Sequence, residues 1–317
     1  MQLLLTRISA LFLTLALILI PSLFADTPQP IDEEEIVSLT PLSKKYNLSV
    51  CAIFKNEAAY LREWLEYNLL IGVDHFYLYN NGSTDDSLIV LEPYIQKGIV
   101  TLIDWPDRND PSIPADAPYK WVVYTQLPAY DHACKVSAIN ETKWLALIDI
   151  DEFILPMQAE TFTEILAKYD SFPGVALIWH TYGTSGVAQI PEKSLLIETF
   201  HMTCHPDHPF NNKIVKSIVK PELFESFSWP PHACNYKDRQ RYFICDKQDA
   251  RINHYINKTT ENVTQSKIKN KEHMENRKLS DAEINELLGL GNEFEADLVI
   301  HRFAPALRQR LGFDPSQ

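Results

Sequence analysis

The segment from Trp144 to Phe153 constrains the fold of this chain more than any other. Residues 144–148 form a continuous apolar run, and Asp149 and Asp151 follow it. An apolar run of this kind is typical of a strand that is buried on both faces of a parallel sheet. Side chains alternate along a strand, so we expect Asp149 and Asp151 to point the same way, at the sheet edge where ligands of open α/β proteins bind.

Two carboxylates that face the same way repel each other unless a cation lies between them. Mg²⁺ and Mn²⁺ prefer oxygen ligands and commonly bridge protein carboxylates to substrate phosphates. The pattern therefore favours a metal-dependent site for a phosphorylated substrate. The alternative is a strand that simply ends in an acidic, solvated turn.

The rest of the chain alternates between strand and helix patterns. Before the carboxylates we expect strands at 48–54, 75–79 and 99–103, and helices at 57–71, at 122–139 and in a segment ending near Gly98. After them we expect a helix at 162–169 and strands at 174–179 and 214–219. Alternation of this kind predicts an α/β fold with a mostly parallel sheet and helices on both faces.

Composition excludes some classes of function. Lys and Arg number 29, whereas Asp and Glu number 42, so the net charge is −13. No long basic stretch interrupts this acidic background, so we expect no nucleic-acid partner. The sequence also has no G-x-G-x-x-G motif and no P-loop, so a nicotinamide enzyme or an ATPase has little support.

We expect four segments along the chain. Residues 1–25 contain the apolar run Ile8–Ile20 and are typical of a secretory signal that is cleaved after Ala25. The alternative is an uncleaved anchor in which residues 3–24 cross a membrane. Both interpretations predict an exported or secretory-pathway protein. We expect a linker at 26–45, the main domain at 46–256 and a charged, helical C-terminal extension at 257–317.

Several blocks of the chain, taken together, resemble glycosyltransferase family 92 and its family-2-like relatives. The D-x-D-E-F block within 144–153 is similar to a block of that family, as are the blocks at 51–65 and 72–85. These three occur in order and at sensible spacing. Weaker similarity is present at 179–186, 213–219 and 253–255, and the resemblance spans about residues 48–271.

The resemblance implies a Rossmann-like GT-A fold that binds a UDP-sugar with a divalent metal, Mn²⁺ or Mg²⁺. Family 92 members look like inverting galactosyltransferases, and several are type II membrane proteins of the secretory pathway. The implied function is metal-dependent transfer of a hexose, with galactose favoured, from a UDP-sugar to a hydroxyl group of a glycan or other acceptor.

The resemblance also implies roles for individual residues. The expected metal ligands are Asp149, Asp151 and His254, with His232 as a competitor for the third place. The residues expected to bind the nucleotide-sugar are Asn56, Glu57, Asn81, Ser83, Asp85, Asp149 and Lys213, with Lys216 as the alternative to Lys213. Glu152 and Trp179 are expected to face the acceptor, and the alternative for each is a structural role.

Inversion requires a general base that deprotonates the acceptor hydroxyl. Glu192, Asp207 and Glu222 lie in the appropriate half of the chain, and their spacing does not choose among them. For the polar residues at the ends of the first two strands, helix capping and turn chemistry are the alternative explanations.

Two other classes of protein compete with this interpretation. Haloacid dehalogenase-like phosphatases also have a strand-terminal D-x-D, whose first aspartate is a nucleophile, but it usually lies on their first strand. Here other strands precede Asp149. A non-catalytic carbohydrate-binding relative of the glycosyltransferases would keep the fold and lack the base.

Overall fold

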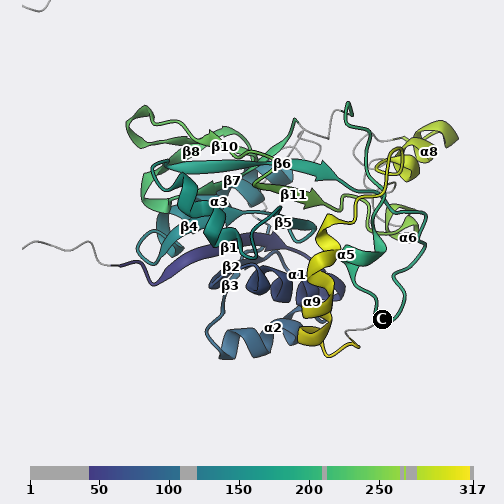
Figure 1. The fold of residues 1–317 in the computed structure, drawn as a ribbon, viewed down its shortest axis with the longest axis horizontal. Helices are drawn as coiled ribbons and strands as arrows, with labels where there is room; N and C mark the ends of the chain where they lie inside the picture. The colour runs from purple at the N-terminus through teal and green to yellow at the C-terminus, as the bar shows by residue number, and fades with distance from the viewer. Residues whose placement is uncertain (1–42, 108–119, 209–212, 265–267, 269–276, 315–317) are drawn as a thin grey trace, which may run out of the picture. The chain divides into compact units, whose positions relative to one another are not determined.

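A mixed nine-stranded sheet lies at the centre of the structure (Figure 1). The computed structural model describes residues 43–107, 120–208, 213–264, 268 and 277–314, which belong to one compact unit that begins at Ser43. The strands of this sheet are β1 (Tyr46–Phe54), β2 (His75–Asn80), β3 (Val100–Asp104), β4 (Thr142–Leu147), β5 (Glu152–Pro156), β6 (Gly174–Thr181), β7 (Val215–Val219), β10 (Phe243–Ile244) and β11 (Ala250–His254).

The strand order is β3-β2-β1-β4-β7-β6-β11-β5, and β10 pairs with β6. The first four strands of this order are parallel to one another. Strand β7 then runs antiparallel to both β4 and β6, and β5 runs antiparallel to β11. The prediction of an α/β fold with a mostly parallel sheet is confirmed.

Helices and 3-10 or π-helical turns connect the strands and follow the last of them, β11. They are α1 (Ala58–Leu70), α2 (Ser87–Gln96), η2 (Val122–Gln126), α3 (Leu127–His132), η3 (Ala133–Ser137), α4 (Phe162–Leu166), η4 (Ala167–Tyr169), α5 (Leu196–Thr199), η5 (Pro221–Leu223), η6 (Lys237–Arg239), α6 (Thr260–Asn262), α8 (Asp281–Gly289), η8 (Val299–Phe303) and α9 (Ala304–Leu311). Strands β8 (Phe224–Trp229) and β9 (Ala233–Tyr236) form a separate antiparallel hairpin.

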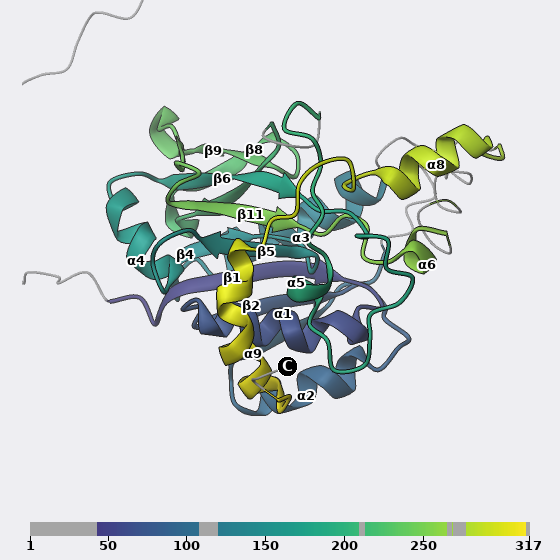
Figure 2. The same ribbon diagram turned by 45° about the vertical axis from the view of Figure 1, so that its right-hand side comes forward.

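The side-chain alternation of β1 shows how the two faces of the sheet are covered. Val50 and Ala52 belong to the larger hydrophobic cluster, which includes buried residues of α1, α2, α4 and α9. Cys51 and Ile53 belong to a second cluster, with residues of the α3 region and of the β8–β9 hairpin. Figure 2 shows α1 and α2 on one side of the sheet and β8 and β9 on the other. Strand β1 is therefore buried on both faces.

The sheet curls back toward its own middle. Only residues 148–151 separate β4 from β5 along the chain, although β7, β6 and β11 lie between them in the sheet. Four residues span little more than about 14 Å, so β5 must lie near the end of β4. Helix α1 stabilises this arrangement, because Trp64 Nε1 donates to the carbonyl of Glu152 (2.9 Å) and Tyr67 OH to that of Ile154 (2.8 Å).

The C-terminal segment does not form the separate extension that the sequence suggested for 257–317. Phe303, Leu307 and Leu311 are buried in the same cluster as β1 and α1, and Figures 1 and 2 show α9 beside α1. Arg251 on β11 also binds Asp297, with Nη2 2.7 Å from Oδ2. The charged composition of this segment concealed the few apolar residues that join it to the core.

The predicted strands and helices before residue 180 match described elements within a few residues, apart from the end of β4. Within the described ranges, no helix has the length and apolar character needed to cross a membrane. The predicted signal or anchor at 1–25 and most of the predicted linker at 26–45 lie outside the described residues.

Candidate functional site

The segment Asp149–Asp151 forms a turn rather than the end of a strand. Strand β4 ends at Leu147, and the amide of Glu152 donates to the carbonyl of Asp149 (3.1 Å). The strand alternation that predicted two carboxylates pointing the same way therefore does not apply. The carboxylates of Asp149 and Asp151 instead have different neighbours.

The carboxylate of Asp149 is held by three side-chain donors. Lys216 Nζ lies 2.7 Å from Oδ2, while Tyr130 OH and Gln126 Nε2 lie 2.7 Å and 3.0 Å from Oδ1. Burial opposes ionisation of this carboxyl group, but the ammonium of Lys216 and the hydrogen bonds outweigh it and lower its pKa. Asp149 is therefore an anion whose oxygens are already engaged by donors.

Lys216 also contacts Glu152, with Nζ 3.3 Å from Oε2, and the side chains of both residues are fully buried. Glu152 Oε2 accepts a hydrogen bond from the amide of Asp149 (2.9 Å), which fixes the turn. Burial raises the pKa of Glu152 well above its usual range despite the attraction of Lys216. The ammonium of Lys216 thus lies between two carboxyl groups and contacts both of them. Because Glu152 is inaccessible, the prediction that it faces an acceptor is wrong.

Asp151 faces His254 across the curl of the sheet. His254 ends β11 and pairs with Glu152 of β5, which places its Nε2 3.7 Å from Oδ1 of Asp151. The amide of Tyr255 donates to the carbonyl of Asp151 (2.9 Å) and holds the turn against β11. One carboxylate and one imidazole form a donor pair that suits Mn²⁺.

Two of the three predicted metal ligands are therefore together. Asp149 is engaged by Lys216, and the described residues contain no group of three or more acidic, His or Cys side chains arranged to hold a metal ion. The pair Asp151–His254 fits a cation whose remaining ligands come from the substrate and water, a common arrangement for Mg²⁺.

Aromatic rings extend from His254 toward solvent. The centroid of Trp179 lies 4.0 Å from that of His254 and 5.3 Å from that of His232, and His232 lies 5.0 Å from Trp229. Trp179 is 8% exposed, so only an edge of the predicted acceptor residue is accessible. Burial lowers the pKa of His232 to about 4, so this ring is neutral at neutral pH. Its Nδ1 lies 3.2 Å from the carbonyl of Val215.

The polar residues at the ends of β1 and β2 lie together and mainly contact one another. Ser83 Oγ accepts from the amide of Asn56 (3.0 Å), and Asn56 Oδ1 accepts from the amide of Thr84 (2.7 Å). Asp85 accepts from the amides of Ala58 (2.8 Å) and Ser87 (3.1 Å), at the starts of α1 and α2. These contacts have the form of capping and turn interactions. Nucleotide binding by these residues stays a prediction.

Asn81 joins the end of β2 to the segment that follows β3. Its Nδ2 donates to the carbonyl of Trp105 (2.9 Å) and to Asp107 Oδ1 (3.0 Å), and its Oδ1 accepts from Trp121 Nε1 (3.2 Å). The side chain of Asn81 is buried. It therefore positions the neighbouring loops, and a direct contact with a nucleotide stays a prediction.

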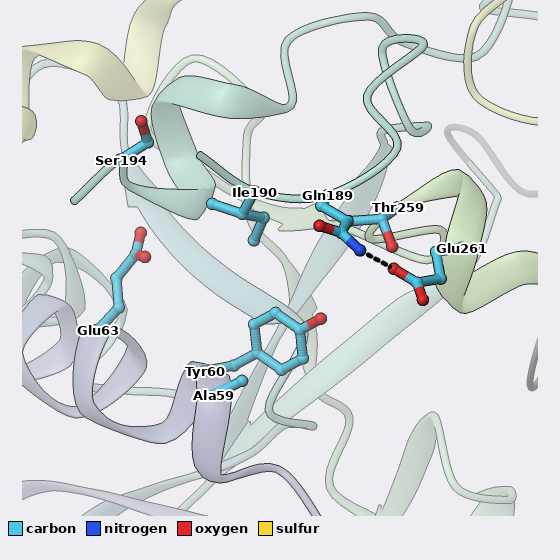
Figure 3. A pocket seen from close by; sticks show the side chains of 8 residues that line it. All are labelled: Ala59, Tyr60, Glu63, Gln189, Ile190, Ser194, Thr259 and Glu261. Carbon is cyan, nitrogen blue, oxygen red and sulfur yellow. Dashed lines mark hydrogen bonds between the residues drawn. The ribbon is translucent and has the colours of Figure 1, made fainter. Parts of the chain in front are cut away.

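Tyr60 lines a pocket of about 290 Å³ (Figure 3), and an ion pair between Lys258 and Glu57 adjoins its ring. Lys258 Nζ is 2.6 Å from Glu57 Oε2 and 4.0 Å from the ring centroid of Tyr60. Burial opposes the charge of Lys258, but Glu57 and Asp151 outweigh it and raise its pKa. The residues that line the pocket are Ala59, Tyr60, Glu63, Gln189, Ile190, Ser194, Thr259 and Glu261.

Glu63 on the wall of this pocket was not predicted from the sequence. Its two oxygens accept from the amides of Leu196 (2.8 Å) and Ile197 (3.1 Å), at the start of α5. Burial raises its pKa from 4.5 to about 7. Gln189 and Glu261 close another side of the pocket through a hydrogen bond of 2.6 Å.

The remaining predicted residues are exposed. Lys213 lies just before β7, and it is Lys216, within β7, whose ammonium contacts Asp149. Glu222 binds Lys44 (2.9 Å) beyond the far end of β7, so it lies away from the carboxylate turn. Glu192 and Asp207 lie in the connection between β6 and β7.

Gln126 and Tyr130 are site residues that the sequence analysis missed. Both lie in the helical segment predicted at 122–139, and their i, i+4 spacing places them on one face of a helix. This spacing was the available signal. No comparable pattern pointed to Lys258, because its pairing with Glu57 joins residues 201 positions apart.

Comparisons with known proteins agree on one family. The model of glycosyltransferase family 92 matches residues 44–288. A family 92 protein of Ricinus communis is 29% identical over an alignment of 225 residues, and the match covers 67% of this chain and 35% of the relative. A family 92 protein of Oryza sativa is 29% identical over an alignment of 217 residues, and the match covers 67% of this chain and 33% of the relative. This chain thus spans about a third of the length of the curated relatives that it matches.

Among solved structures, S. aureus TarS 1–349 is similar at 13% identity, over 83% of this chain and 73% of that chain, with a TM-score of 0.36. A likeness this distant carries no conclusion about activity. The family model, in contrast, covers more than half of the sequence. The chain belongs to glycosyltransferase family 92.

Proposed function

We propose that this chain is a metal-dependent, inverting glycosyltransferase that transfers a hexose, with galactose favoured, from a UDP-sugar to a hydroxyl group of a glycan or other acceptor. The observation that carries the proposal is the pairing of Asp151 with His254 next to the Asp149–Lys216 ion pair, in a chain of this family. Both pairs lie at the end of β4, where ligands of α/β sheets bind.

Asp151 and His254 are the residues that would hold the metal. A divalent cation bound there supplies Lewis-acid stabilisation of the charge that develops on the leaving diphosphate. Asp149 acts differently, because Lys216 already neutralises it. Its role is to fix the turn so that the side chain of Asp151 stays toward His254, with Glu152 bonded to the amide of Asp149 as a second restraint.

The ends of β1 and β2 form the edge on which the nucleoside would lie. Asn56, Ser83 and Asp85 hold these loops through backbone hydrogen bonds, which gives the edge a fixed shape. Pre-organised loops lower the entropic cost of binding a flexible nucleotide. Glu57 is itself neutralised by Lys258, so the edge presents less negative charge to a diphosphate.

Sugar identity and stereochemistry rest on the family resemblance alone. Inversion requires a base that takes the proton of the acceptor hydroxyl. Glu192 and Asp207 remain the candidates, because both lie in the β6–β7 connection whereas Glu222 lies beyond the far end of β7. A phosphatase with Asp149 as nucleophile is disfavoured, because Lys216, Tyr130 and Gln126 occupy both carboxylate oxygens.

The test is UDP release from UDP-galactose with Mn²⁺, compared between the wild type and the variants Asp151→Asn and His254→Gln. We expect both variants to lose at least about tenfold in rate, since each removes one ligand of a shared cation. Asp170→Asn is the matched control, because that exposed aspartate pairs with Lys143 (2.8 Å) and Lys220 (3.4 Å) instead. Wild-type rates in both site variants would contradict the proposal.

A further inference from the structure

Trp229 is an exposed aromatic residue that the predicted site did not include. It ends β8 and is 48% exposed. The pairing of the β8–β9 hairpin is irregular between Phe227 and Trp229, and such bulges change the direction of a side chain. The ring centroids of Phe224 and Phe227 lie 5.3 Å apart within the hairpin, whereas the ring of Trp229 lies against that of His232.

The tip of this hairpin is fixed to the strand that carries Lys216. Ser217 Oγ donates to the carbonyl of His232 (2.9 Å), and His232 Nδ1 lies 3.2 Å from the carbonyl of Val215. These two contacts flank Lys216, whose ammonium holds Asp149. Trp229 is therefore anchored, through His232, to the same strand as the centre of the proposed site.

A continuous series of rings leads from Trp229 to that centre. The ring contacts run from Trp229 to His232, Trp179 and His254, and His254 faces Asp151 at 3.7 Å. We call these four rings the aromatic row. Only its outermost ring, Trp229, is exposed to a large extent, while Trp179 is 8% exposed. The row therefore has one accessible platform, separated from Asp151 by the width of the intervening rings.

The chemistry of this platform favours a sugar ring. An indole offers a wide apolar face with a polar edge, and stacking on it tolerates many ligands with a flat apolar face. A pyranose has such a face, formed by its axial C–H groups, and hydroxyl groups around its rim. We propose that Trp229 binds a pyranose ring of an oligosaccharide acceptor, at a distance from the ring whose hydroxyl reacts. This inference rests on the proposed function, because it concerns the acceptor of that reaction.

The test measures sugar binding separately from catalysis. The probes are lactose and methyl β-galactopyranoside, and galactitol serves as the control ligand, since it carries hydroxyl groups but no rigid ring face. Binding is measured by saturation-transfer NMR and titration calorimetry. We expect Trp229→Ala to weaken lactose binding about tenfold, which corresponds to about 1.4 kcal/mol. We expect Trp229→Phe to restore part of it, and galactitol not to bind.

Phe243→Ala is the matched protein control. Phe243 is 42% exposed and contacts Phe172 and Tyr169, but it lies on β10, beside the start of β6 rather than its end. Urea denaturation followed by circular dichroism should give Trp229→Ala the same slope as the wild type, which shows that the variant is folded whether or not the protein turns over a donor. Equal lactose binding by wild type and Trp229→Ala would overturn the proposal, and so would an equal loss in Phe243→Ala.

The two proposals can fail separately. If the wild type releases no UDP from any UDP-sugar but binds lactose through Trp229, the platform is supported and the glycosyltransferase proposal is refuted. If it releases UDP but binds pyranosides no better than galactitol, the platform is refuted and the transferase proposal stands.

Discussion

Lys216→Met is the substitution that probes the centre of the site most sharply. Methionine keeps the length and apolar stem of the side chain but removes the ammonium that contacts Asp149 (2.7 Å) and Glu152 (3.3 Å). Breaking a buried ion pair from one side costs about 3–5 kcal/mol when the remaining charge is fully buried. Two features of the site reduce this cost.

Asp149 keeps its bonds from Tyr130 and Gln126, and its side chain is 32% exposed, so water replaces part of the lost interaction. Glu152 is fully buried, but it keeps the hydrogen bond that its Oε2 accepts from the amide of Asp149 (2.9 Å), and burial raises its pKa well above its usual range, which disfavours an uncompensated charge there. We therefore expect Lys216→Met to lower the free energy of unfolding by about 2–3 kcal/mol. Adding Asp149→Asn removes the orphaned charge and should recover about 1 kcal/mol or more of that loss.

The assay is urea denaturation at pH 7, followed by tryptophan fluorescence, with the slope of the transition compared between variants. Lys143→Met is the matched control, because Lys143 pairs with Asp170 at the surface, where the side chains are 40% and 51% exposed. A surface pair of this kind contributes about 0–1 kcal/mol. The reasoning is refuted if Lys216→Met costs no more than Lys143→Met, or if Asp149→Asn deepens the loss.

Two further predictions concern the pocket and the tail. Because burial raises the pKa of Glu63 from 4.5 to about 7, its protonated form contributes stability that is fully present below pH 4.5 and is lost as pH rises from 4.5 to about 7. Between pH 5 and pH 8 the wild type should lose about 2–3 kcal/mol of unfolding free energy relative to Glu63→Gln. If urea denaturation gives the same dependence of unfolding free energy on pH for both proteins, this prediction is wrong. Gly183→Ala would place a Cβ 2.5 Å from the backbone carbon of Gly291, so it should cost about 1–3 kcal/mol. Gly289→Ala meets no atom within 4 Å and should be neutral or slightly stabilising in thermal unfolding.

The strands and helices of the first half were predictable because the apolar residues of each recur at the spacing of a strand or of a helix. Strand β1 and helix α1 fell where the apolar pattern placed them, and so did β6. The direction of the two aspartates was not predictable in the same way. Strand β4 ends before them, and the side chain that takes hold of Asp149 comes from Lys216, 67 residues later.

The domain limit after residue 256 shows the same kind of error. Composition marked the tail as charged, and helix α8 has no fully buried residue. Its continuation, however, packs Leu307 and Leu311 into the core beside β1. Trp229 was overlooked for a related reason. Its contact with His232, the next ring of the aromatic row, depends on the packing of the β8–β9 hairpin on β7. Contacts between segments that are distant in sequence decide both cases, and the spacing of apolar residues within one segment does not predict such contacts.

One measurement tests the central claim most directly. Purified protein is incubated with Mn²⁺ and, in turn, UDP-galactose, UDP-glucose and UDP-N-acetylglucosamine, and released UDP is quantified for the wild type and for Asp151→Asn. We predict metal-dependent UDP release from at least one donor, with UDP-galactose fastest, and a loss of at least about tenfold in Asp151→Asn. Release that is absent with every donor, or equal in the two proteins, would contradict the account.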